Sequence, residues 1–187
     1  TSVQKNYIQD YISEFETVLR GQNFTDPVNG YAKYIDIDSF IVNDFCSEIT
    51  REVDTYRYST YVTKERNGKL KMSPQWDFNL SMGNNDYRSF GLQTQHHTSG
   101  WNRDTSTSMS EYRWHKRLLE DEEYLRRYAD KWFHFRESIL SDSAIEASID
   151  NKKHLVDQGA ASRNFNRWDI LNSYAGFYWA YPGSNFY

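Results

Sequence analysis

Two aspartates, Asp54 and Asp77, have the residue type and the spacing that could support metal-dependent or acid–base chemistry. Residues 57–64 between them are rich in β-branched and aromatic side chains, and residues 69–72 alternate as a returning strand would. Because a hairpin brings its two ends together, we expect the two carboxylates within about 10 Å of each other. Such a pair could bind a divalent cation, or place a general base beside a metal. The alternative is that each aspartate caps a turn.

The elements that must position these aspartates follow from the periodicity of the apolar residues. The segment before Asp54 predicts one helix over 3–20 and a second helix that is capped by Asp36 or Asp38 and ends in residues 51–54. The apolar face expected for the second helix contains Ile37, Ile41, Phe45, Ile49 and Val53. Between the two strands, Asn67-Gly68 is the favoured pair for a type I′ turn.

After a long polar segment at 84–108, the rest of the chain has a helical pattern. Helices are expected over about 109–119, 121–139, from Asp142 onward and over 161–171. We therefore predict a mainly α (α+β) fold with one short β-hairpin, organised as a single domain over residues 1–187.

Composition excludes several classes of function. The net charge is −4 and no basic tract is present, which argues against a nucleic-acid partner. No segment approaches the roughly 20 apolar residues of a membrane span. Cys46 is the only cysteine, so an intrachain disulfide is impossible, and we expect Cys46 to be a buried small hydrophobe. Aromatic residues make up 17% of the chain, and they could serve a core or a ligand surface.

The order of motifs resembles the catalytic half of a protein kinase. In kinases the catalytic-loop aspartate is followed five positions later by a metal-binding Asn, then by a hairpin and the Asp-Phe-Gly aspartate that binds magnesium. Here Asp54 is followed by Ser59 at that position, by the hairpin, and by Asp77-Phe78-Asn79.

The amino-acid sequences of these segments resemble those of the spore coat protein H (CotH) kinase family, whose members are secreted atypical kinases. The most specific match is the Pro-x-Trp-Asp-Phe segment within residues 68–79 (GKLKMSPQWDFN). Supporting matches are residues 33–40 (KYIDIDSF), 52–61 (EVDTYRYSTY), 114–119 (WHKRLL), 140–142 (LSD) and 163–168 (RNFNRW). The resemblance spans most of the chain.

The resemblance implies a role for each matching residue. Asp54 would be the catalytic aspartate that orients or deprotonates the attacking hydroxyl. Asp77 would bind Mg²⁺ or Mn²⁺ with ATP, together with Ser59 and Asn79, and Trp76 would pack beside the cofactor or belong to the core. Two of these positions depart from the family pattern, because Ser59 replaces an Asn and Asn79 stands where many members have an acidic residue.

The resemblance also implies partners and a location. We expect the chain to be a C-terminal lobe that works with its own N-terminal lobe, a nucleotide and a protein substrate in the full-length form, and that is secreted or at the cell surface. No strand-borne lysine motif precedes Asp54, so the chain alone should be inactive. Two alternatives are a catalytically degenerate kinase-like scaffold and, on aromatic content alone, a glycan-binding domain. His96-His97 are expected to be solvated loop residues, and Trp101, Trp132, Trp168 and Trp179 core or interface anchors.

Overall fold

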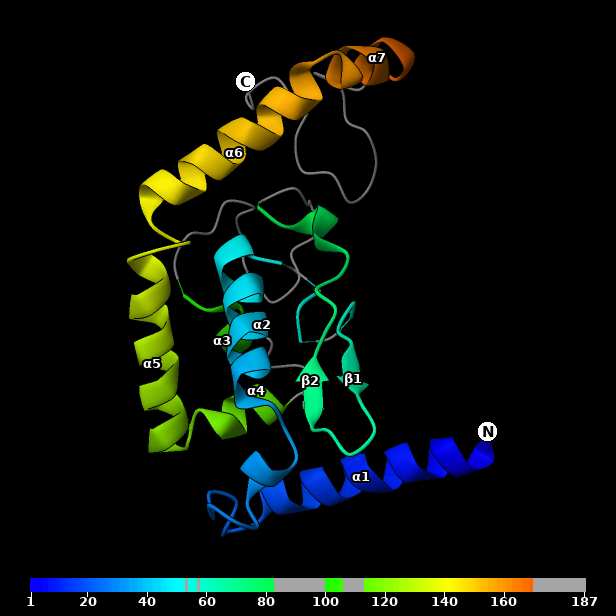
Figure 1. Cartoon of the computed structure of the whole chain (residues 1–187), viewed down its shortest axis with the longest axis vertical. Coiled ribbons are helices and arrows are strands. Elements are labelled where there is room, and N and C mark those ends of the chain that lie inside the picture. The colour runs from blue at the N-terminus through cyan, green and yellow to red at the C-terminus, as the bar shows by residue number, and fades with distance from the viewer. Residues whose placement is uncertain (53, 57, 83–99, 106–112, 170–187) are drawn as a thin grey trace.

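The computed structural model of the chain describes residues 1–52, 54–56, 58–82, 100–105 and 113–169, and it is mostly helical (Figure 1). The elements in chain order are α1 (Ser2–Arg20), η1 (Tyr31–Lys33), α2 (Ile37–Thr50), β1 (Val62–Lys64), β2 (Leu70–Met72), η2 (Phe78–Leu80), α3 (Asn102–Thr105), α4 (Arg113–Leu118), α5 (Glu122–Arg136), α6 (Asp142–Asp157) and α7 (Ala160–Arg167). The sheet in the described part of the chain is two-stranded and antiparallel. The predicted fold class is therefore confirmed.

Helix α2 lies between α5 and the hairpin (Figure 1). It begins as expected at Asp36, whose side chain accepts a hydrogen bond from the backbone nitrogen of Ser39 (3.1 Å). It ends at Thr50, because Arg51 adopts a left-handed conformation (φ 56°). The predicted continuation of this helix to residue 54 is therefore wrong.

The hairpin packs against the beginning of α2. The backbone of Leu70 donates to Tyr34 and accepts from Asp36 (both 2.8 Å), and the nitrogen of Met72 donates to the hydroxyl of Ser39 (3.2 Å). Leu70 and Met72 are both buried, whereas Lys71 between them is exposed. This alternation of burial is what a strand with one face on the core requires.

The hairpin differs from its prediction in two ways. The first strand covers only 62–64 instead of 57–64, because Ser59 is left-handed (φ 50°) and interrupts the extended segment. The turn is not type I′, since that type needs positive φ at both central residues and only Asn67 has it (φ 60°). A bond from the nitrogen of Gly68 to the oxygen of Glu65 (3.0 Å) closes the turn.

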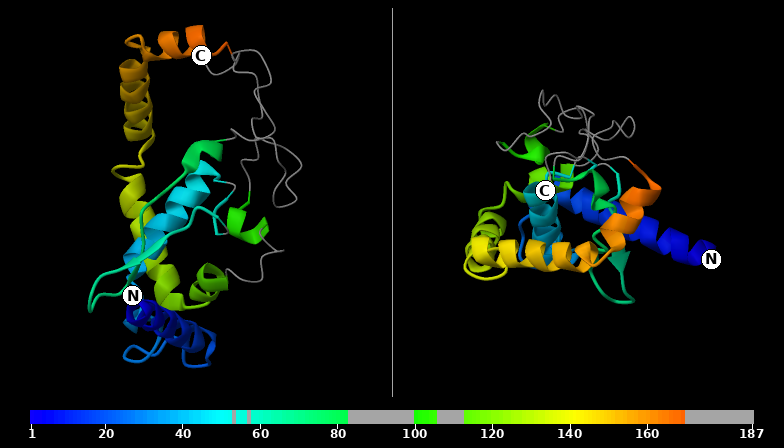
Figure 2. Two further views of the ribbon diagram at one scale, coloured as in Figure 1. Left: turned by 90° about the vertical axis from the view of Figure 1, so that its right-hand side faces the viewer. Right: turned by 90° about the horizontal axis from the view of Figure 1, so that it is seen from above.

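Aromatic rings supply much of the core, as the composition predicts. Phe45 of α2 packs edge-on against Tyr128, Trp132 and Phe135 of α5, with ring centroids 4.6–6.0 Å apart. Phe15 of α1 meets Trp114 of α4 in the same way at 5.1 Å. Helix α1 thus covers one end of the core, and α7 lies at the opposite end of the molecule (Figure 2).

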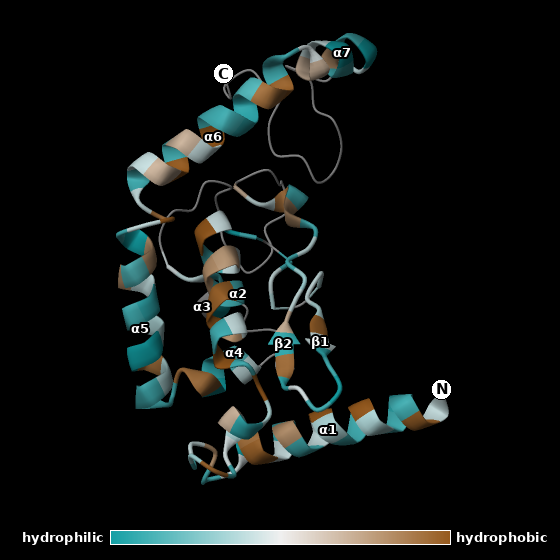
Figure 3. Ribbon diagram, viewed as in Figure 1, coloured by the Kyte–Doolittle hydropathy of each residue, from teal (hydrophilic) through white to brown (hydrophobic). Residues whose placement is uncertain are grey.

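Helices α6 and α7 contribute no buried residue, although both have apolar side chains (Figure 3). Trp132 packs against the core, as one of its two predicted roles requires, whereas Trp168 is 59% exposed and Trp101 is 44% exposed, so neither is a core anchor. Their alternative role as interface anchors stays a prediction, and Trp179 lies outside the described residues. Ile49 is also exposed, and Cys46 is only half-buried. None of the helices in the described ranges combines the length and the apolar character needed to cross a bilayer.

Candidate functional site

Asp77 lies just beyond the hairpin, five residues after the end of β2. It precedes η2 with a left-handed backbone (φ 67°), and its carboxylate makes no capping hydrogen bond to that helix. Instead, Asp77 Oδ2 accepts a hydrogen bond from the hydroxyl of Ser59 (3.2 Å). The alternative prediction, that the Asp77 side chain caps a turn, is therefore wrong for this residue.

Ser59 and Asn79 both lie against Asp77. Ser59 is itself left-handed (φ 50°), which turns its hydroxyl from the loop before β1 toward the segment after β2. With its amide nitrogen facing Asp77, Asn79 donates to the backbone oxygen of Asp77 (3.1 Å) and to Oδ1 (2.8 Å). The structure thus brings together the three residues that the sequence proposed as metal ligands. Asp77 and Asn79 are exposed and Ser59 is half-buried.

Asp54 belongs to the turn that leads directly to Ser59. Its backbone oxygen accepts a hydrogen bond from the nitrogen of Tyr58 (2.8 Å), and its own nitrogen donates to Glu52 Oε1 (3.1 Å). Asp54 is half-buried. Its turn ends at Tyr58, and the next residue, Ser59, makes the contact with Asp77. The expected separation of about 10 Å between the two carboxylates stays a prediction.

Trp76 is 56% exposed, so its alternative role as a core residue is wrong. Its ring meets Tyr61 edge-on, with centroids 6.4 Å apart. The pair forms an exposed aromatic surface next to Asp77, and a role beside a cofactor stays a prediction.

A buried polar network below the turn anchors this region. Tyr56, two residues after Asp54, donates its hydroxyl to Asp44 and Glu48 of α2, and the contact with Glu48 is 3.0 Å. Asp44, which is 1% exposed, also accepts from Tyr128 (2.5 Å) and from Arg103 Nη1 (2.6 Å). The guanidinium and the two hydroxyls supply the hydrogen bonds that a buried carboxylate requires.

Glu48 connects the same network to α3. Its carboxylate accepts from the backbone nitrogens of Asn102 (2.7 Å) and Arg103 (3.0 Å), which are the first two residues of that helix. Burial raises the pKa of Glu48, and the two backbone donors partly oppose this effect. Burial also raises the pKa of Tyr56 well above its ordinary value, so Tyr56 acts as a hydrogen-bond donor.

This network was not predicted from the sequence. The sequence feature that indicates the network is the position of Asp44 and Glu48 on α2. They are four residues apart and next to the apolar positions Ile41 and Phe45. Charged residues within a buried helical face need partners, and those partners come from distant segments. The structure places them at Tyr56, at residues 102–103 and at Tyr128.

Other predicted features add little to the site. His96-His97 lie outside the described residues. Within the described ranges, no group of three or more His, Cys, Asp or Glu side chains could hold a metal ion.

Comparison with known proteins agrees with the geometry at the level of a family. The family model described as CotH kinase protein matches residues 1–182, which is nearly the whole chain. No curated protein and no solved structure matches the chain.

Proposed function

Because this chain belongs to the CotH kinase protein family, we propose that it supplies the C-terminal lobe of an atypical protein kinase. In the full-length form this lobe takes part in metal-dependent transfer of phosphate from ATP to a protein hydroxyl. The single observation that supports the proposal most is the contact between Ser59 and Asp77 (3.2 Å), because it joins the catalytic-loop segment to the metal segment.

The residues near Asp77 have the chemistry that a hard divalent cation prefers. Asp77 offers a carboxylate and Ser59 a hydroxyl, and Mg²⁺ binds through oxygen ligands with one or two carboxylates plus phosphates. The amide nitrogen of Asn79 faces Asp77, so Asn79 would offer its amide oxygen to a cation only after the amide turns over. The exposure of Asp77 allows phosphate oxygens and water to complete the shell. The donor set therefore fits Mg²⁺ or Mn²⁺ bound with ATP.

The proposed mechanism divides the work between two aspartates. Asp54 orients the acceptor hydroxyl and takes its proton, while Asp77 with Ser59 and Asn79 holds the cation. When bound, the cation neutralises charge on the phosphates. Trp76 and Tyr61 form an apolar wall beside this site. Phosphoryl transfer depends mostly on position and on charge neutralisation, so each carboxylate is essential.

We further propose that the nucleotide is gripped mainly by an N-terminal lobe outside this chain. Residues 1–52, all of which are described, form α1, η1 and α2 and contain no strand that could carry a phosphate-binding lysine. The chain alone is then inactive, and its partners are its own N-terminal lobe, a nucleotide and a protein substrate. A secreted or cell-surface location belongs to the same proposal.

A second candidate is a kinase-like scaffold that no longer transfers phosphate. The observation in its favour is the composition of the site, where Ser59 and Asn79 surround Asp77 with neutral groups. Fewer charged ligands bind a cation more weakly. The two candidates differ in phosphate transfer and not in fold.

The test uses the full-length protein and three matched Asp→Asn variants. With labelled ATP and Mg²⁺ or Mn²⁺, wild type should incorporate phosphate into protein, whereas Asp54→Asn and Asp77→Asn should lose about 100-fold or more of the rate. Asp150→Asn on exposed α6 should keep the wild-type rate. Nucleotide binding without transfer in wild type would support the scaffold. A wild-type rate in Asp77→Asn would show that Asp77 does not hold the cation.

A further inference from the structure

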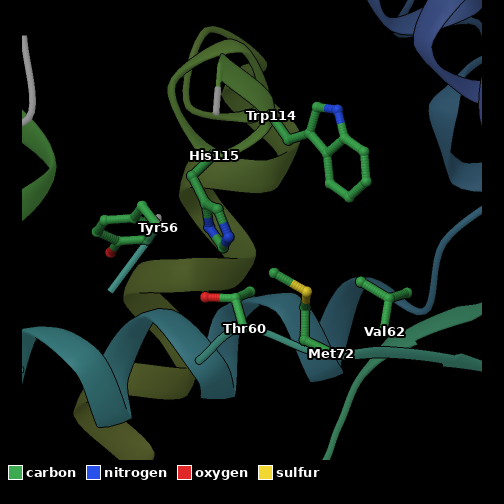
Figure 4. A pocket seen from close by; sticks show the side chains of 6 residues that line it. All are labelled: Tyr56, Thr60, Val62, Met72, Trp114 and His115. Carbon is green, nitrogen blue, oxygen red and sulfur yellow. The ribbon is translucent and has the colours of Figure 1, made fainter. Parts of the chain in front are cut away.

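A cavity of about 170 Å³ lies between the hairpin and α4, apart from the Ser59–Asp77 site. Its lining consists of Tyr56, Thr60, Val62, Met72, Trp114 and His115 (Figure 4). The volume is close to that of an engineered cavity of about 150 Å³ that binds benzene. The cavity is therefore large enough for one six-membered ring.

His115 brings an unsatisfied polar group to this cavity. The residue is 5% exposed, and neither nitrogen of its ring has a hydrogen-bond partner among the residues that the structure describes. Nδ1 lies 3.6 Å from Asp44 Oδ1, which is too long for a hydrogen bond. Figure 4 shows the ring reaching from α4 toward Thr60 and Met72. A ligand in the cavity could thus supply a hydrogen bond that the fold leaves unmade.

The surroundings of His115 favour a neutral ligand. Burial lowers the pKa of His115 from its ordinary value of 6.5, so the ring is neutral at pH 7 and offers one donor and one acceptor. Asp44, the charged group nearest the ring, is itself paired with Arg103 (2.6 Å), so this side of the ring presents little net charge to balance that of a ligand. The ligand therefore carries no charge.

The other walls favour an aromatic ring. Val62 and Met72 are apolar, and the Met72 thioether and the Trp114 indole both make favourable contacts with aromatic rings. Thr60, Val62 and Trp114 are half-buried, in contrast to the buried Met72 and His115, so a ligand enters from the side of the first three.

We propose that this cavity binds a small neutral aromatic ring with one hydroxyl group, a phenol, through a hydrogen bond to His115. The same chemistry is present in free phenols and in the tyrosine side chain of a peptide. Because Thr60 directly follows Ser59, and Tyr56 lies two residues after Asp54, the ligand would sit against the loop that carries the candidate site.

The test titrates p-cresol and toluene separately into the 187-residue chain and follows binding by NMR. Wild type should bind p-cresol about tenfold more tightly than toluene, which is the effect of one net hydrogen bond. His115→Phe should remove this preference, whereas His154→Phe on exposed α6 should retain it. N-acetyltyrosine amide distinguishes the two sources: binding of the amide points to a peptide, and binding of p-cresol alone points to a free phenol.

If His115→Phe does not fold, the proposal is tested on the wild-type chain alone by NMR with p-cresol. Bound p-cresol should shift the side-chain nitrogens of His115 and give contacts to the Met72 methyl group. Equal affinity for p-cresol and toluene, no binding of p-cresol, or binding that leaves His115 and Met72 unchanged would each overturn the proposal.

Discussion

Among single residues near the candidate site, Tyr56 joins the turn to two buried carboxylates of α2. It is 4% exposed, and its hydroxyl is shared between Asp44 and Glu48. Removing that donor leaves two buried carboxylates with one hydrogen bond fewer each. Since Tyr56 lies between Asp54 and Ser59, its loss should loosen the turn that holds both.

We predict that Tyr56→Phe lowers the free energy of unfolding by about 1–3 kcal/mol, which is the usual effect of an unsatisfied buried acceptor. Chemical denaturation of the purified chain measures this change. Tyr61→Phe removes the same atom from a residue that is 51% exposed, and it should change stability by about 0.5 kcal/mol or less. Equal effects of the two variants would show that the buried network does not stabilise the fold.

His115 leads to a prediction for the pH dependence of stability. Burial lowers its pKa below the ordinary 6.5 in the folded protein, so the unfolded chain takes up a proton first as the pH falls. Stability from the neutral ring is complete above about pH 6.5 and decreases below it. Glu48 acts in the opposite direction, because its raised pKa makes the folded state bind its proton first.

The His115 contribution can be isolated by comparing pH slopes. Between pH 7 and pH 5, wild type should lose more free energy of unfolding than His115→Phe, because only wild type has the buried imidazole. His154→Phe, which removes an exposed histidine of α6, should have the wild-type slope. Parallel curves for wild type and His115→Phe would contradict the lowered pKa.

At the scale of elements, the loop between α1 and η1 depends on the absence of a side chain at Gly30. A Cβ atom there would overlap the backbone oxygens of Phe24 and Asp26 and lie 2.7 Å from the nitrogen of Asp26. The backbone of Gly30 has an ordinary negative φ (−73°), so close approach and not conformation requires glycine. This approach lets Tyr31 donate to the oxygen of Phe24 (2.8 Å) and enter the core.

We predict that Gly30→Ala destabilises the chain by about 2 kcal/mol or more, since backbone must move to admit the methyl group. Gly68→Ala is the matched control in the hairpin turn, where a Cβ would meet its nearest atoms at an ordinary 3.4 Å. Its effect should be within about 0.5 kcal/mol. Thermal unfolding of both variants provides the comparison, and a harmless Gly30→Ala would mean that the loop is not packed as described.

At the scale of the whole molecule, α6 and α7 stand apart from the core. Neither contributes a buried residue, whereas α2 contributes seven. Ile149 and Leu155 of α6 and Trp168, the residue that follows α7, are 59–62% exposed. With so little burial among the described residues, the stability of these helices comes mainly from local contacts, such as the Ser141 cap of α6.

Hydrogen exchange should therefore differ between the two parts of the molecule. We predict that backbone amides of α6 and α7 exchange much faster than those of α2, because they open without disrupting the core. Exchange followed by mass spectrometry of peptides from each helix measures this difference. Equal protection in α6 and α2 would mean that the exposed face is covered in solution.

Local features of the fold could be predicted, because they depend on neighbours in sequence. The helix over 3–20, the Asp36 cap and the hairpin all follow from periodicity, capping chemistry and turn residues. The first strand was predicted too long, since its residues favour extended structure and only tertiary contacts explain the left-handed Ser59.

Sequence patterns were sufficient to predict most of the helices, the hairpin, the family and the two aspartates that flank the hairpin, but not every boundary. Contacts between distant segments bring Ser59 against Asp77 and bury Asp44 with Tyr56, Arg103 and Tyr128. Non-glycine residues adopt left-handed backbone only where their surroundings compensate its cost of about 1–2 kcal/mol, and a buried carboxylate needs donors that lie up to 84 residues away. Neither condition is visible in a local stretch of sequence.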